Sequence, residues 1–169
     1  MLDALGRIAR CITDRPVLAG GYRPIEASYS VTFAPRGFPV PLGAKDGRRG
    51  VGLLINHYYR VVHSGEESRR GWEVQPTGYF YEILDPDGRE ILSYHWHPEA
   101  SGPDHPHLHL SGRLPPFDLG PRFAPVALGA VHVATGQVAF GAVVRMLIEE
   151  FGVAPRRADW RGVVAAVGR

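Results

Sequence analysis

A hairpin in the middle of the chain constrains the fold more than any other feature of the sequence. Residues 79–84 and 89–97 are rich in aromatic and aliphatic side chains, a composition typical of strands. Residues 85–88, with the sequence Asp-Pro-Asp-Gly, separate them and form a strong turn signal. The two segments are therefore expected to pair as neighbouring antiparallel strands.

Other parts of the chain also favour strands. Residues 25–33 alternate between apolar and polar side chains, which is the pattern of a strand with one buried face. Residues 51–62 predict a longer strand, after a connection over residues 34–50 that is rich in proline, glycine and arginine. Short strands are predicted at residues 107–111 and 126–133.

Helical patterns lie at the two ends of the chain. Apolar side chains recur about one turn apart over residues 2–12. Residues 137–151 predict a helix that Thr135 can cap, and residues 159–167 predict a last short helix. We therefore expect one α+β domain over residues 1–169, mainly an antiparallel sheet, with a short N-terminal helix and two C-terminal helices packed on one face.

Length and composition fit a globular protein. The chain has 169 residues, 44% of them hydrophobic, and a formal net charge of +2, which permits contact with nucleic acid without requiring it. Its single cysteine, Cys11, excludes a disulfide within the chain. There is no signal-peptide pattern, and no run approaches the roughly 18 apolar residues of a membrane span. We expect a cytoplasmic protein with no membrane partner.

The chemistry of the chain is expected to centre on a group of histidines. Five of the eight histidines fall within a short segment: His95, His97, His105, His107 and His109. Side chains alternate between faces along a strand, so His95 and His97 share one face of their strand. His107 and His109 do the same on theirs. If these two strands pair, four or five imidazoles converge on one face of the sheet.

Metal binding is one interpretation of this cluster. A His-x-His segment offers two neutral nitrogen ligands on one face, and zinc, nickel or manganese would be the cofactor. A nearby carboxylate can add an oxygen ligand. The residues predicted for this site are His95, His97, His107, His109 and Glu99.

Acid–base catalysis is the second interpretation, and it requires no cofactor. Histidine titrates near neutral pH, so one imidazole can accept a proton while another donates one. Cleavage of RNA through attack by a ribose 2′-hydroxyl needs such a pair. The residues predicted for this chemistry are His107 and His109 as the pair, His95, His97 and Tyr94 as assisting groups, and Arg89 and Arg113 as phosphate-binding groups.

A third interpretation is a non-enzymatic interaction module, in which the sheet face binds a partner and the histidines are solvated. Of the remaining histidines, His57 is predicted to lie in the core or sheet, His63 at a turn and His132 at the end of a strand. An exposed edge strand would also allow a homo-oligomer. The sequence leaves these alternatives open.

Several short motifs resemble those of a prokaryotic protein family. They are Tyr79-Phe80-Tyr81, the turn of residues 85–88, Tyr94, Pro98 and Pro106-His107-Leu108-His109. Together they resemble the TumE-like toxins of toxin–antitoxin pairs, over residues 79–148. The resemblance implies an antitoxin partner and an activity directed at RNA. It carries over His107 and His109, and less directly the segment 95–98.

Overall fold

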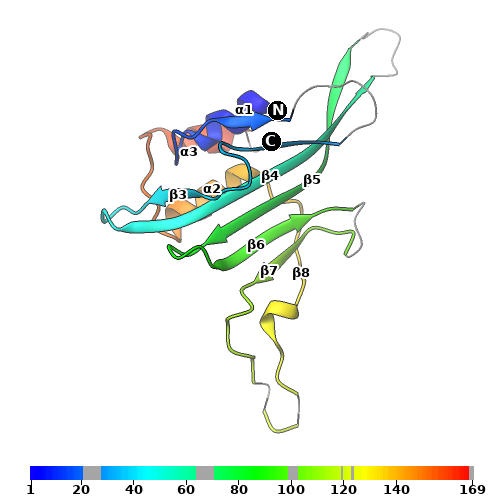
Figure 1. Ribbon diagram of the computed structural model, residues 1–169, viewed down its shortest axis with the longest axis vertical. Helices are drawn as coiled ribbons and strands as arrows, with labels where there is room; N and C mark the ends of the chain where they lie inside the picture. Colours follow the sequence, from blue (N-terminus) through cyan, green and yellow to red (C-terminus); the bar gives the residue numbers. More distant parts are fainter. Residues whose placement is uncertain (21–27, 64–70, 99–102, 119, 123, 168–169) are drawn as a thin grey trace.

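The structure is a computed structural model that describes residues 1–20, 28–63, 71–98, 103–118, 120–122 and 124–167. Antiparallel pairing between strands forms most of it (Figure 1). Its helices and strands are α1 (Leu2–Ala9), β1 (Val17–Ala19), β2 (Tyr29–Phe33), β3 (Val40–Gly43), β4 (Arg49–His63), β5 (Trp72–Leu84), β6 (Glu90–Trp96), β7 (His107–Leu110), the 3₁₀ helix η1 (Leu128–Ala130), β8 (Val133–Ala134), α2 (Phe140–Glu149) and α3 (Trp160–Val167). Among the described residues, eight strands form one sheet in the order β1-β2-β4-β5-β6-β7-β8, and β3 pairs with β4.

The expected α+β class is confirmed. Every strand pair in the described part of the chain is antiparallel, and α1, α2 and α3 pack on one face of the sheet (Figure 1). One hydrophobic cluster joins side chains of the three helices to alternate residues of β2, β4 and β5. Among its most buried members are Phe33, Leu53, Ile55, Tyr81 and Leu147. No helix in the described part of the chain is long and apolar enough to cross a bilayer.

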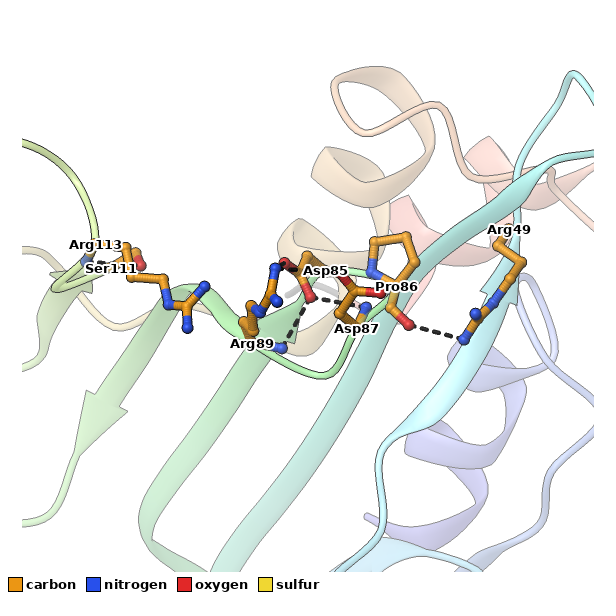
Figure 2. A network of polar contacts seen from close by, with 7 residues as sticks. All are labelled: Arg49, Asp85, Pro86, Asp87, Arg89, Ser111 and Arg113. Carbon is orange, nitrogen blue, oxygen red and sulfur yellow. Dashed lines mark hydrogen bonds and ion pairs between the residues drawn. The ribbon is translucent and has the colours of Figure 1, made fainter.

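The central hairpin is also confirmed, and its turn has a clear physical basis. The Oδ1 atom of Asp85 accepts hydrogen bonds from the backbone N–H groups of Asp87 and Arg89, each at 2.9 Å. Gly88 has a φ of 80°, a conformation that residues with a side chain rarely adopt. Figure 2 shows this turn, in which the Arg49 guanidinium also donates to the Pro86 carbonyl at 2.8 Å.

Strand β5 is longer than predicted, because it begins at Trp72 and not at residue 79. Its first half pairs with the second half of β4, from Tyr59 opposite Pro76 to His63 opposite Trp72. A register shift at this point leaves Thr77 as an extra residue. A bulge and a proline without an N–H both interrupt the alternation on which the prediction depended.

Two other local predictions were wrong. Residues 126–133 form the helix η1 and only the start of the two-residue strand β8, in place of one continuous strand. Helix α2 begins at Phe140, and Thr135 does not cap it. The reason is that the N–H of Thr135 donates to the Pro106 carbonyl at 2.8 Å, which keeps the chain extended beside β7.

The remaining segments agree with the sequence in outline. The segment 34–50, predicted as a connection, contains the short strand β3. The strand expected over residues 25–33 is described from Tyr29 onward as β2, while residues 25–27 lie outside the described residues. The first helix ends at Ala9, earlier than predicted.

His57 lies on the helix-covered face of β4, as expected of a core histidine. Its Nε2 and the hydroxyl of Tyr81 are joined by a hydrogen bond of 2.6 Å, and its ring packs edge-on against Phe140. Burial lowers the pKa of His57 to about 4. The neutral imidazole is therefore part of the core.

This burial predicts a loss of stability in acid. The pKa of His57 is about 4 in the folded protein and 6.5 when exposed, so the unfolded state binds more protons between these two pH values. The stability that depends on neutral His57 is complete above pH 6.5 and is lost as the pH falls towards 4, by up to about 3 kcal/mol.

Urea unfolding across this pH range tests the prediction. In His57→Gln the free energy of unfolding should fall less steeply with acid than in the wild type. The control His63→Gln, at the exposed end of β4, should follow the wild type. Equal pH slopes in the wild type and in His57→Gln would contradict this role.

Candidate metal centre

The histidine cluster lies on the face of the sheet that the helices leave open. His95 of β6 is directly opposite His107 of β7, and Ser93 is opposite His109. The pair between these two, Tyr94 and Leu108, points to the helix side, where the Tyr94 hydroxyl donates to the Met146 sulfur at 3.7 Å. Because side chains alternate between the two faces along a strand, the histidines point to the other face, away from the helices.

Three of these side chains form a compact set of possible ligands. In His95, His107 and His109, one ring nitrogen from each lies within 4.8 Å of the others. The rings of His95 and His109 are 4.5 Å apart between centroids, and those of His107 and His109 are 4.9 Å apart. Nitrogens bound tetrahedrally to zinc are separated by about 3.4 Å, so the three side chains would have to rotate towards one another to hold an ion in that geometry.

Buried nitrogen atoms without a partner mark this cluster. Among the described residues, Nε2 of His95, Nδ1 of His97 and Nε2 of His107 are buried and have no hydrogen-bond partner. The Nδ1–H of His107 donates to the His105 carbonyl at 2.8 Å, which leaves the lone pair on Nε2. His107 is only 1% exposed. A buried polar atom left unpaired costs about 1–3 kcal/mol, which a bound cation would remove.

The cluster favours neutral imidazoles, the form that binds metals. Burial is the main cause, and the charge that each neighbouring imidazole would carry adds to it. Together they lower the pKa of His95 to about 4. The same effects lower the pKa values of His107 and His109.

Two further histidines flank the three central rings. The ring of His97 lies 5.4 Å from that of His107, on the side of strand β5. The ring of His132 lies 4.4 Å from that of His109, on the opposite side. The sequence predicts His132 at the end of a strand. Its place beside β7 follows from the pairing of β8, which no local pattern showed.

The fifth predicted histidine, His105, contributes mainly through its backbone. Its carbonyl orients His107, and its exposed ring lies 3.5 Å from the carboxylate of Asp104. Glu99, the predicted oxygen ligand, lies outside the described residues.

Three residues predicted for acid–base chemistry are not part of the cluster. Tyr94 is on the helix-covered face. Arg89 forms an ion pair with Asp87 at 3.1 Å (Figure 2). It lies six residues before His95, which corresponds to about 20 Å along an extended strand. Arg113 lies beyond the end of β7.

A carboxylate that the sequence analysis missed lies next to the cluster. Ser93, buried opposite His109, donates from its hydroxyl to Oε1 of Glu90 at 2.7 Å. The charge of Glu90 favours the protonated form of His109, in opposition to the burial effect. Acidic groups of this kind often orient histidine ligands in metal sites.

Comparison with known proteins adds no relative. No protein-family model, curated protein or solved structure matches this chain. The resemblance to TumE-like toxins therefore stays a prediction, and the function has to be argued from the site itself.

The unpaired nitrogen of His95 predicts that this residue lowers the stability of the metal-free protein. Replacing the imidazole in His95→Phe removes a buried atom without a partner and keeps a ring against Phe80. The melting temperature in the presence of a chelator should rise by about 2–4 °C, which corresponds to about 1 kcal/mol.

The matched control is His63→Phe, which changes an exposed histidine outside the cluster and should leave the melting temperature unchanged. If His95→Phe is instead less stable than the wild type without metal, the His95 nitrogen has a stabilising partner and the argument is wrong.

Proposed function

We propose that the protein binds a divalent transition metal ion, zinc above all, through His95, His107 and His109. One observation carries this proposal: the ligand nitrogens of three histidines on two paired strands lie within 4.8 Å of one another. Imidazole ligands suit zinc, nickel and copper, while manganese prefers oxygen ligands. We therefore place zinc and nickel before manganese among the metals expected from the sequence.

The number of ligands favours a catalytic role. Structural zinc sites are usually closed by four protein ligands, whereas catalytic sites have three and keep the fourth position for water or substrate. His97 and His132 flank the set of three without joining it. A metal held in this way would lower the pKa of a bound water to about 7 and support hydrolysis near neutral pH.

The electrostatics of the site also favour a cation. The Glu90 carboxylate, fixed by Ser93, lies next to His109 and would stabilise positive charge there. A divalent ion would therefore meet three imidazoles that favour the neutral form, with the negative charge of Glu90 nearby.

Zinc titration of the purified, chelator-treated protein tests this function. One equivalent should bind and raise the melting temperature, by an amount equivalent to about 2.7 kcal/mol at a concentration 100 times the Kd. In His109→Ala the affinity should fall by more than the 10–100-fold that loss of an outer-shell group causes. The control His63→Ala should bind zinc like the wild type.

The absence of any stabilisation by zinc, nickel or manganese would overturn the proposal. Circular dichroism of each variant without metal separates lost ligands from lost structure. An equal loss of affinity in His63→Ala would show that zinc binds to surface histidines in general.

A second candidate function is metal-independent cleavage of RNA, the activity that a toxin of the TumE-like kind would need. The observation in its favour is the orientation of His107, whose Nε2 lone pair is fixed by the bond from Nδ1 to the His105 carbonyl. Such a nitrogen can accept the proton of a ribose 2′-hydroxyl. The lowered pKa values of His95, His107 and His109 make a protonated partner scarce among these three near pH 7.

An RNA cleavage assay with and without chelator separates the two functions. If the metal carries the activity, cleavage stops with chelator and returns with zinc, and this is the result we expect. If the histidines act alone, cleavage persists in chelator and is lost in the double variant His107→Ala/His109→Ala. Retained cleavage in that variant would exclude both mechanisms.

A further inference from the structure

A pocket adjoins the histidine cluster on the open face of the sheet. It has a volume of about 510 Å³, and among its lining residues are Tyr58, Thr77, Gly78, Phe80, His95 and His97. His95 and His97 therefore line the pocket and also belong to the histidine cluster. A molecule in the pocket would contact the imidazole of a proposed metal ligand.

The pocket depends on a missing side chain. Gly78 lies opposite Tyr58 of β4, and its neighbour Tyr79 lies opposite Trp96, so Gly78 sits between the Tyr58 and His97 positions. A Cβ atom at Gly78 would be 2.6 Å from the Trp96 carbonyl oxygen and 3.5 Å from the Tyr58 ring. The Trp96 backbone is too close for a side chain to fit there. The glycine therefore leaves backbone peptide groups at the base of the pocket, between the aromatic rings that line it.

The walls of the pocket are aromatic and uncharged. Tyr58 is 37% exposed, so part of its side chain is open to a ligand. The Phe80 ring lies 4.5 Å from that of His95. None of the described lining residues is Asp, Glu, Lys or Arg, and the polar groups are hydroxyls and imidazoles. Rings of this kind bind flat, uncharged molecules by stacking, and hydroxyls fix their polar edges.

We propose that this pocket binds a heteroaromatic ring of the nucleobase type and holds it beside the histidine cluster. This inference deepens the proposed function, on which it rests, because it names the substrate class that the metal centre would act on. A nucleobase has two faces for stacking on aromatic side chains and an edge of hydrogen-bonding groups. The ring can belong to a free nucleoside or to single-stranded nucleic acid.

Ligand binding to the zinc-treated protein tests the pocket. The probes are adenosine, guanosine, cytidine and uridine, each followed by saturation-transfer NMR and titration calorimetry. At least one should bind with a Kd in the millimolar range or below. Tyr58→Ala should weaken that binding about 10-fold or more, since it removes a stacking surface.

The control for Tyr58→Ala is Trp72→Ala. Trp72 is another exposed aromatic residue of the β4–β5 hairpin, 60% exposed, and it lies outside the pocket lining. This variant should bind the nucleoside like the wild type, and both variants should bind zinc like the wild type. Tighter binding of a short single-stranded oligonucleotide than of its nucleosides would assign the ring to nucleic acid, and equal binding would assign it to a free nucleoside.

The variant His109→Ala separates this inference from the proposed function. His109 does not line the pocket, so the variant should lose zinc and keep the nucleoside. If the wild type binds nucleosides but not zinc, the metal function fails and the pocket stands. If it binds zinc but none of the four nucleosides at millimolar concentration, or if Tyr58→Ala binds them equally well, the inference is overturned.

Discussion

The pairing of β6 with β7 is the interaction on which the candidate site depends. It places His95 opposite His107 and Ser93, with its bound Glu90, opposite His109. A shift of one residue in either strand would send its histidines to the helix-covered face. Packing on the helix-covered face stabilises the β6–β7 register, since the Tyr94 hydroxyl there donates to the sulfur of Met146 in α2. The apolar packing on one side of the sheet therefore fixes the arrangement of imidazoles on the other.

Two half-buried histidines show how the same electrostatic effect can accompany different roles. Burial lowers the pKa values of His57 and His95 alike, each to about 4. His57 shares a hydrogen bond with Tyr81 and contributes to the core. The Nε2 atom of His95 has no such partner among the described residues, and neither does that of His107. A nitrogen with its hydrogen bond made is explained by folding, whereas a group of buried lone pairs without partners is better explained by a ligand.

The sequence predicted the parts of the site that depend on local order. The alternation of side chains was enough to place His95 with His97, and His107 with His109, each pair on one face of its strand. That these two strands pair was left as a condition, and the structure meets it with His95 opposite His107. The same alternation places Tyr94 on the opposite face from His95, so its assignment to the site could have been rejected from the sequence. His132 and Gly78 could not be placed, because their positions depend on pairing with strands distant in the chain or on the bulge at Thr77.

The cluster is built from strands of unequal rigidity, and this bears on how it would work. His95 is on an inner strand, bordered by Phe80 of β5 on one side and by His107 on the other. His132 immediately precedes β8, a two-residue strand at the edge of the sheet, and it is exposed. Movement at His132 would cost few hydrogen bonds, whereas movement at His95 would disrupt two neighbouring strands. A metal held by the inner three residues would therefore keep its position beside the Tyr58 pocket, while the edge histidine adjusts around it.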